Sequence, residues 1–332
     1  MAGRTVAVVG ATGAVGRELF EVLEEREFPI DEMRPLASDS RSGRTIKFRN
    51  KDIAVEPARP ESFRGADLVF FAAGASVSLE LTPKAVEAGA VVIDKSSAWR
   101  YEDDVPLVVP EVNRDDIALH KGIIASPNCS TIQMVVALAP VHRVHPIHRV
   151  VVSTYQSVSG ASAAAMLELD AQARAIAEGK QPEVKILPRQ IAYNVIPEVE
   201  TFRPEDGYTS EEWKLANETR KIMHAPDIRI SATCVRVPVY RSHSEAVSAE
   251  FTEPVSAAEF RRILASAPGV KVVDDITSGA YPTALDASGN DHVWVGRIRE
   301  DVSTDNGIVF WVVSDNLRKG AATNAVQIAE SL

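Results

Sequence analysis

The sequence predicts an α/β fold of two domains, a doubly wound parallel sheet followed by an α+β domain with a mostly antiparallel sheet. Three observations predict this fold. The chain has 332 residues, more than a single hydrophobic core usually organises. Before residue 128, short apolar strands alternate with helical patterns, which is typical of parallel sheets. After it, the strands are longer and few helices separate them, which favours antiparallel pairing.

The first domain is expected to open with a buried strand over 5–9 that stops at Gly10. Apolar residues from Val15 to Leu23 follow at helical spacing, so a helix comes next. A second helix fits residues 78–88. Further strands are predicted over 34–37, 67–72, 90–94, 107–109 and 122–125.

The second domain is expected to contain one long Ala-rich helix, over 163–177, among its strands. The last segment, 319–332, has a helical pattern and is expected to pack back on the first domain. The domain boundaries that follow are 1–128 with 316–332 for the first domain, and 129–315 for the second. The strands of the second domain are predicted over 149–155, 229–240, 245–251, 293–298 and 308–313.

The composition argues against several classes of protein. The formal net charge is −10, which disfavours a broad surface for nucleic acid or for an anionic membrane. No apolar segment reaches the roughly 18 residues that a membrane span requires, and we expect no signal peptide. The two cysteines, Cys129 and Cys234, do not make a disulfide framework. We therefore expect a cytoplasmic protein that acts on small molecules.

A glycine-rich turn joins the first strand to the first helix. Its first glycine permits a tight turn, the second lets the backbone approach a pyrophosphate, and the third lets helix and strand pack closely. The helix N-terminus adds N–H donors and the positive end of its dipole. The spacing, GxxGxxG, is weak by itself, but its place between a strand and a helix indicates a dinucleotide-binding site. The expected cofactor contacts are Gly10, Thr12, Gly13, Ala14, Val15 and Gly16.

The segment after the second strand indicates which dinucleotide binds. An acidic residue there would hold a ribose 2′-hydroxyl, whereas an arginine accommodates a 2′-phosphate. This segment offers hydroxyl and guanidinium groups in Ser38, Arg41 and Ser42, although Asp39 lies among them. Such groups suit a phosphate, so we expect NADP(H) as the cofactor. The alternative is an ordinary solvated loop.

Cys129 is the candidate nucleophile. It follows Pro127 and Asn128 and precedes an apolar helical pattern from Ile132 to Ala139, so it is expected at the entry of a helix. There the helix dipole and unpaired N–H groups stabilise a thiolate and lower its pKa. A lone intracellular cysteine is more often a buried, inert thiol, and that interpretation is kept for Cys234. For Cys129, the helix entry at the domain junction favours a nucleophile.

A thiol nucleophile beside a nicotinamide is typical of a thioester route between an aldehyde and an activated acid. The sequence resembles the aspartate-semialdehyde dehydrogenase family in VVGATGAVG at the start, SPNCST around Cys129, YQSVSG from Tyr155, EEWKLANETRKI from Glu211 and RVPVYRSHSE from Arg236. The resemblance covers nearly the whole chain. It implies an N-terminal Rossmann domain followed by a catalytic and dimerisation domain of the glyceraldehyde-3-phosphate dehydrogenase-like type.

The resemblance implies a reaction and its catalytic residues. Cys129 would attack the acyl phosphate of L-aspartyl-4-phosphate, expel phosphate and form a thioester. NADPH would then deliver a hydride, and the product would be L-aspartate 4-semialdehyde. His243 matches the acid/base of the family, a role that suits an imidazole near neutral pH. Gln156 matches the amide that orients the substrate near the cysteine.

Further matches imply binding residues. Arg236 matches the clamp on the α-carboxylate of the substrate, for which a planar guanidinium is suited. Glu211 would face the substrate amino group; Glu212 is adjacent, and Glu211 is chosen for its spacing to Lys214. The residues expected to hold the leaving phosphate are Arg100, Asn128 and Lys214. Those expected near the nicotinamide are Ser159, Gly160 and Asn316.

The family also implies a metabolic role and an assembly. Its product leads to lysine through diaminopimelate, and to threonine, methionine and isoleucine. Its members form homodimers, which in some cases pair into tetramers. No metal ion is expected. His142, His145 and His148 are spaced like ligands, but Pro146 breaks any helix and no cysteine or carboxylate is near them in the sequence, so a linking loop is preferred.

Two alternatives remain open. N-acetyl-glutamyl-phosphate reductase shares the fold, the cysteine thioester and NADPH, but its cysteine neighbourhood reads more like NPGCY, whereas Ser130 and Thr131 follow Cys129 here. A non-catalytic NADP-binding paralogue, acting as a sensor or scaffold, would be expected to have lost Cys129 or His243. Both residues are present.

Overall fold

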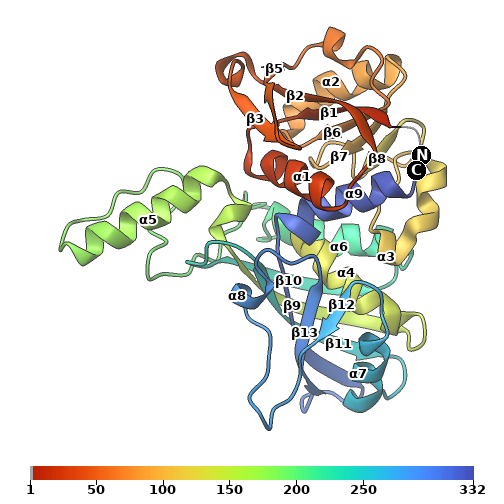
Figure 1. Cartoon of the computed structure of the whole chain (residues 1–332). Helices are drawn as coiled ribbons and strands as arrows, with labels where there is room; N and C mark the ends of the chain where they lie inside the picture. Colours follow the sequence, from red (N-terminus) through yellow and green to blue (C-terminus); the bar gives the residue numbers. More distant parts are fainter. Residues whose placement is uncertain (1–2) are drawn as a thin grey trace. The chain divides into compact units, whose positions relative to one another are not determined.

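The computed structural model describes residues 3–332 and divides into two compact units. The first unit runs to Asn128 and takes in the last segment, Ala321–Leu332. The second unit is Cys129–Gly320. Each unit combines helices with a six-stranded sheet (Figure 1).

The sheet of the first unit is entirely parallel, with its strands in the order β5-β2-β1-β6-β7-β8. Parallel neighbours need crossover connections, and α-helices provide those from β1 to β2 and from β6 to β7. The strands are β1 (Arg4–Val9), β2 (Ile30–Ala37), β5 (Glu56–Pro57), β6 (Leu68–Phe71), β7 (Val91–Asp94) and β8 (Ile123–Ala125). The main helices are α1 (Ala14–Glu25), α2 (Ala75–Glu87) and α9 (Thr323–Glu330).

Alternation along β1 explains why both faces of this sheet are covered. Val6 and Val8 belong to a hydrophobic cluster with residues of α1 and α9, whereas Ala7 and Val9 belong to a second cluster with residues of α2. Successive side chains of a strand point to opposite faces. An unbroken apolar strand is therefore stable only where helices cover both sides, as the sequence predicts.

Most strands predicted for this unit are confirmed, with differences at their ends. β2 begins four residues before the predicted start, at Ile30, because two exposed acidic side chains interrupt its apolar pattern. The strand predicted over 107–109 is wrong. Only Leu107 makes an isolated bridge, to Ala125, and the proline at each end of the segment has no N–H for a sheet ladder.

The second unit holds a mixed sheet in the order β10-β9-β11-β14-β13-β12. Its three central pairs are antiparallel, as predicted, and both edge pairs are parallel. The parallel pair of β9 and β10 is possible because a long helical connection joins them. The strands are β9 (Ile147–Gln156), β10 (Arg229–Arg236), β11 (His243–Phe251), β12 (Val270–Val272), β13 (Val293–Glu300) and β14 (Gly307–Ser314).

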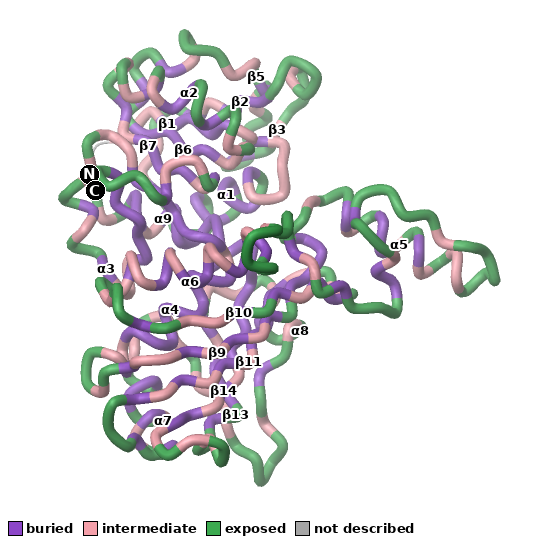
Figure 2. The backbone as a smooth tube through the Cα atoms, turned by 180° about the vertical axis from the view of Figure 1, so that it is seen from behind, coloured by how far each residue is buried: buried purple, intermediate pink, exposed green. Residues whose placement is uncertain are grey.

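Helices pack on this sheet. α4 contacts β9, β13 and β14, α6 contacts β10, and α7 contacts β12 and β13. Almost every residue of α4 is buried, which is typical of a helix that is apolar on all sides. α5 instead projects away from the sheet and forms a small cluster of its own, and much of this projection is exposed (Figures 1 and 2). The helices are α4 (Cys129–His142), α5 (Ala163–Ala177), α6 (Ser210–Ile222) and α7 (Ala257–Ala265).

In the second unit, one predicted helix is confirmed, one predicted strand is shorter than expected, and one helix is not predicted from periodicity. The helix predicted over 163–177 is confirmed at both ends as α5. The strand predicted over 229–240 ends early, at Arg236, because Pro238 has no N–H and the Val239 N–H turns back to the Val237 carbonyl. Periodicity does not reveal α6, because its buried face includes three glutamates.

The remaining elements are short or unusual. The last segment begins with a π-helical turn and continues as α9, which contacts α1 and β7. No helix within residues 3–332 has the length and apolar character to cross a membrane. The short elements escape prediction because they span only a few residues: β3 (Thr45–Phe48), β4 (Lys51–Ala54), α3 (Pro110–Asn113) and α8 (Ala284–Ala287).

Gly16 is expected to resist substitution because α1 passes close to the turn before it. A Cβ at Gly16 would lie 2.2 Å from the Gly10 carbonyl oxygen, whereas one at Gly13 would lie 3.3 Å from the same atom. A Gly→Ala change in a helix normally stabilises it by about 1 kcal/mol. We predict the reverse for Gly16→Ala, a loss of about 1–3 kcal/mol in the free energy of unfolding. Urea denaturation, with Gly13→Ala as the matched control, measures it, and equal stability of the two variants would contradict the prediction.

Candidate active site

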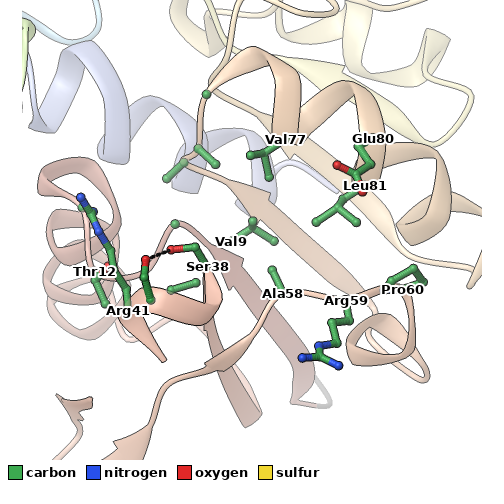
Figure 3. Close-up of a pocket in the computed structure, with 17 residues that line it drawn as sticks. Val9, Thr12, Ser38, Arg41, Ala58, Arg59, Pro60, Val77, Glu80 and Leu81 are labelled. Atoms are coloured by element: carbon green, nitrogen blue, oxygen red, sulfur yellow. Dashed lines mark hydrogen bonds between the residues drawn. The ribbon is translucent and has the colours of Figure 1, made fainter. Parts of the chain in front are cut away.

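The first unit contains a cavity of about 720 Å³ at the carboxyl end of β1 (Figure 3). It is lined by the ends of β1, β2 and β6 and by the start of α2. In the strand order of this sheet, the chain leaves β1 toward one edge and later returns to build the other edge from β6 onward. Ligands of doubly wound sheets bind at such a switch point.

The glycine turn shapes the wall of this cavity. Gly10 has a φ of +85°, a conformation that side-chain-bearing residues rarely adopt. Its N–H donates to the Leu36 carbonyl at 2.9 Å, and a Cβ on Gly10 would lie 2.5 Å from the Ala72 carbonyl oxygen. α1 then begins after Gly13 with no side-chain cap, so the N–H groups of its first turn can serve an anion.

The predicted cofactor residues of this unit divide into two groups. Five of them line the cavity: Gly10, Thr12, Gly13, Ser38 and Arg41. Four do not line it: Ala14, Val15, Gly16 and Ser42. The first three of these four form the first turn of α1, and the hydroxyl of Ser42 donates to the Asp39 carbonyl at 2.8 Å.

The end of the cavity next to β2 carries a basic residue that the sequence analysis missed. Arg59 lines the cavity (Figure 3). Its Nη2 lies 3.1 Å from Asp39 Oδ1. Asp39 therefore has a partner of opposite charge. Ser38 and Ser40 place two hydroxyls 3.2 Å apart at the same end. The sequence does not predict Arg59 at this site, because the pairing of β2 with β5, and not proximity in the sequence, brings it to the end of β2.

Two predicted phosphate residues, Arg100 and Asn128, are buried in the first unit. Arg100 Nη2 donates to the Lys95 carbonyl at 2.8 Å. Lys95 Nζ in turn donates to the carbonyl of Pro127 at 3.2 Å. Lys95, which the sequence analysis did not single out, thus ties the segment of Arg100 to the residue before Asn128. The third predicted phosphate residue, Lys214, belongs to the second unit.

Three predicted residues of the second unit lie side by side at one end of its sheet. Arg236, the last residue of β10, pairs in register with Gln156, the last residue of β9. On the other side of β9, Ser244 pairs with Tyr155, which brings His243 next to Gln156. All three side chains are buried. We refer to Arg236, Gln156 and His243 as the site row.

Cys129 is the first residue of α4 and is partly exposed. A Cβ on Gly320 would lie 2.9 Å from the Cys129 Cβ, so the chain passes closely over the cysteine. Burial lowers the pKa of the Arg236 guanidinium, and the negative charges of Glu211 and a Cys129 thiolate oppose that shift. Arg236 is thus near both groups. Cys234 differs from Cys129, because burial in β10 raises the pKa of its thiol and keeps it protonated.

His243 has a defined tautomer in this structure. Its Nδ1 accepts a hydrogen bond from the backbone N–H of Ser157 at 3.0 Å, and a backbone N–H can only donate. The neutral ring therefore carries its proton on Nε2. Burial and the positive charge of Arg236 lower the pKa of His243 to about 3, so the ring is neutral at pH 7. Nε2 is buried and has no hydrogen-bonding partner among residues 3–332.

The predicted nicotinamide residues surround this imidazole. A Cβ on Gly160 would lie 2.9 Å from His243 Nε2 and 3.1 Å from Arg236 Nη1, so a residue without a side chain leaves room at Nε2. Asn316 Oδ1 accepts hydrogen bonds from Ser159 Oγ at 3.1 Å and from Ser157 Oγ at 3.2 Å. Ser157 itself was missed, although it directly follows the predicted Gln156.

A chain of polar contacts leads from the site row to α6. Thr154 Oγ1 donates to Gln156 Oε1 at 3.1 Å, and Gln156 Nε2 donates to Glu211 Oε1 at 2.9 Å. Lys214 Nζ donates to the other Glu211 oxygen at 3.3 Å. These directions fix the orientation of the Gln156 amide. Thr154 lies two residues before Gln156 on the same face of β9, a signal that the sequence analysis did not use.

The adjacent glutamates of α6 have different surroundings. Glu212 forms a capping box with Thr209, whose N–H donates to Glu212 Oε2 at 2.7 Å. The other oxygen of Glu212 accepts the N–H of Cys234 at 2.9 Å. Both oxygens of Glu212 therefore bind the backbone. Glu211 is the one whose carboxylate reaches the site row.

The three histidines around Pro146 do not converge. His142 Nδ1 accepts the N–H of Ile147 at 3.0 Å. His145 Nε2 lies 3.9 Å from Glu259 and His148 Nε2 lies 3.6 Å from Glu250. In the part of the chain that the structure describes, no group of three or more histidines, cysteines or carboxylates is arranged to hold a metal ion.

A second buried layer lies beneath the site row. Glu245 follows His243 by two residues on β11 and pairs with Thr154 in register. Burial raises the pKa of Glu245 well above its usual range, and the nearby amide of Gln133 lowers it less. Gln133 lies one helical turn after Cys129, so this pair sits between the helix and strand of the site.

Two family models match the chain. The semialdehyde dehydrogenase NAD binding domain matches residues 5–120, and the semialdehyde dehydrogenase dimerisation domain matches residues 138–319. The aspartate-semialdehyde dehydrogenase of Aquifex aeolicus is 53% identical over 334 residues, which cover 99% of this chain and 98% of the relative. That of Bacillus subtilis is 48% identical, with 99% of this chain and 97% of the relative covered.

Solved structures agree with these relatives. Aspartate semialdehyde dehydrogenase II of Vibrio cholerae, complexed with ASA, superimposes with a TM-score of 0.97 at 46% identity and covers 100% of this chain and 98% of its own. The aspartate semialdehyde dehydrogenase of Candida albicans with NADP has a TM-score of 0.77 at 27% identity, with 100% and 98% covered.

Glu245 is expected to make stability depend on pH. Burial raises the pKa of Glu245 in the folded protein, whereas the unfolded chain keeps the usual value of about 4.5. Below pH 4.5 the carboxyl is protonated in both states, so it does not change the free energy of unfolding with pH. As pH rises above 4.5, the unfolded chain releases this proton more readily than the folded protein, so the free energy of unfolding falls. We predict that Glu245→Gln, which removes the ionisation at nearly equal size, gains stability relative to wild type as pH rises. The slope is at most about 1.4 kcal/mol per pH unit. Urea unfolding of both proteins between pH 5 and pH 8 measures it, and parallel pH profiles would contradict it.

Proposed function

Since this chain belongs to the aspartate-semialdehyde dehydrogenase family, we propose that it reduces L-aspartyl-4-phosphate to L-aspartate 4-semialdehyde with NADPH and releases phosphate. The observation that carries the proposal is the site row beside Cys129, in which a buried guanidinium, amide and imidazole come together near a thiol at a helix N-terminus. The product leads to lysine and diaminopimelate, threonine, methionine and isoleucine.

Cys129 is the nucleophile of the proposed reaction. Its thiolate forms a bond to the acyl carbon, the bond from that carbon to the phosphate oxygen breaks, and phosphate leaves with the electron pair. A thioester on Cys129 results. The N-terminus of α4 and the positive charge of Arg236 favour the thiolate over the thiol. NADPH, when bound, supplies a hydride to the thioester carbon. The thiohemiacetal on Cys129 then releases the aldehyde and restores the thiolate.

His243 moves the protons of these steps. Its Nε2–H donates to the negative charge that develops on the former carbonyl oxygen. To accept a proton at Nε2, the ring must carry its other proton on Nδ1, which gives up the hydrogen bond that Nδ1 accepts from the Ser157 N–H. The hydroxyl of Ser157, 3.1 Å away, then accepts from Nδ1–H in its place. The low pKa of His243 means that a protonated ring returns its proton readily. Gln156, held at both ends by Thr154 and Glu211, orients the substrate.

The charges around the site row favour aspartyl phosphate over an acetylated substrate. Arg236 provides a planar guanidinium for the α-carboxylate. Glu211 provides a buried carboxylate for the free amino group. An N-acetylated substrate has a neutral amide at this position, so it would not offer Glu211 the charge-assisted hydrogen bond that a free ammonium group makes. Lys214, with Arg100 and Asn128, is proposed to bind the leaving phosphate.

The first unit fits NADP(H). The turn at Gly10, the uncapped start of α1 and the cavity beside them suit a pyrophosphate. Arg41 and Arg59 with Ser38 suit a ribose 2′-phosphate, and Asp39 is paired with Arg59 rather than left for a 2′-hydroxyl. The Candida albicans relative with NADP supports this choice. The match to a dimerisation domain supports a homodimer, which we expect to work in the cytoplasm.

The reverse reaction tests the proposal. We predict that the protein reduces NADP when given aspartate semialdehyde and inorganic phosphate, and that omission of phosphate removes the activity, because phosphate must cleave the thioester. Absorbance at the nicotinamide band follows the reaction. N-acetyl-glutamate semialdehyde in a parallel reaction is the control. Activity with the acetylated aldehyde alone would refute the substrate, and inactivity with both, with NADP still bound, would favour a sensor or scaffold.

Cys129→Ala tests the thioester route. We predict a loss of turnover of at least about 10³-fold, because removal of a nucleophile leaves only binding and electrostatic contributions. NADPH binding, measured by fluorescence titration, should be unchanged. Cys234→Ala is the matched control, since it removes the buried and protonated thiol of β10. Substantial activity in Cys129→Ala would show that the reaction does not proceed through this cysteine.

A further inference from the structure

Glu200 lies in the loop that precedes α6. Its side chain is 41% exposed, and its carboxylate contacts α6 at two points. Ser210 Oγ donates to Oε2 at 2.7 Å, and Lys214 Nζ donates to Oε1. Ser210 and Lys214 are four residues apart, so they lie on the same face of the helix, one turn from each other. One carboxylate thus bridges the first turn of α6 and Lys214.

The backbone around Glu200 holds it in this position. Its φ is +64°, in the left-handed region that residues other than glycine seldom occupy and that costs about 1 kcal/mol or more. The next residue, Thr201, accepts the N–H of Ser210 at 2.9 Å, and Phe202 forms an isolated bridge to Thr209. The loop is therefore attached to the N-terminus of α6, and these contacts hold Glu200 beside that helix.

Lys214 depends on its neighbours for a defined position. A lysine side chain has about 2 kcal/mol of rotamer entropy, which must be overcome to hold its ammonium at one place. Lys214 is only 14% exposed, and its ammonium contacts carboxylates from two elements, Glu200 on the loop and Glu211 on α6. Glu211 also holds the amide of Gln156.

Resting on the proposed function, in which Lys214 binds the phosphate, we propose that Glu200 is a positioning residue that fixes the Lys214 ammonium for that phosphate. Glu200 acts through Lys214 and not on the reacting atoms. Its second effect is to leave Glu211 available. Without the Glu200 carboxylate, Lys214 keeps its contact with Glu211 and competes with the substrate amino group for that carboxylate. Loss of Glu200 therefore weakens phosphate binding most and semialdehyde binding less.

Steady-state kinetics of the reverse reaction tests this role. Glu200→Gln is expected to raise KM for phosphate about tenfold and KM for aspartate semialdehyde by a smaller factor, while kcat and KM for NADP change less than threefold. Glu200→Asp keeps the carboxylate and should recover most of the loss. Glu198→Gln is the matched control. It removes the same charge from the same loop, and Glu198 makes no side-chain hydrogen bond or ion pair within residues 3–332. The KM values of the Glu198→Gln variant should therefore stay within twofold of wild type.

Calorimetric binding of inorganic phosphate, without aldehyde, separates this proposal from the proposed function. Tenfold weaker binding in Glu200→Gln and a larger loss in Lys214→Ala support the positioning role, even if aspartate semialdehyde is not turned over. Unchanged binding in Glu200→Gln, or an equal loss in Glu198→Gln, overturns it. Tighter binding in Glu200→Gln also overturns it, because Glu200 would then compete with phosphate. Wild-type binding in Lys214→Ala overturns it as well.

Discussion

Backbone pairing between β9 and its two neighbours is the interaction on which the chemistry of the second unit depends. β10 runs parallel to β9 and β11 antiparallel, so the ends of two strands and the start of a third meet at one edge of the sheet. The register brings Arg236, Gln156 and His243 together there. A slip of one residue would turn each side chain to the opposite face. α4 packs on β9 and contributes Cys129 from its first residue.

Hydrogen-bond direction and charge balance then set the state of each group. The Ser157 N–H fixes the His243 proton on Nε2, and Thr154 and Glu211 fix the Gln156 amide. Glu245 is buried two residues after His243 on β11, and burial raises its pKa well above the usual range, which disfavours a negative charge there. Polar groups buried at this density restrict one another to few arrangements. The site therefore presents a preorganised set of donors and charges.

In the first unit, backbone contacts and strand pairing also determine where the groups that line the cavity lie. The close approach of Gly16 to the Gly10 carbonyl brings α1 against the turn, and Gly10, Thr12 and Gly13 of that turn line a ligand-sized cavity. Pairing of β2 with β5 then adds Arg59 to the end of β2. Backbone contacts thus shape the end of the cavity at the glycine turn, and strand register adds a cation, Arg59, at its other end.

The sequence by itself determined the features that depend on neighbours along the chain. The glycine turn between β1 and α1, the long helix α5, most buried strands and the helix entry at Cys129 follow from spacing within a few residues. Only the tertiary structure decided the contacts between distant segments. Arg59 meets Asp39 across 20 residues and Glu211 meets Gln156 across 55. Such partners depend on strand register and helix packing, which local patterns do not encode. For the same reason, Thr154 and Glu200 became recognisable only when the folded chain brought them to the side chains that they hold.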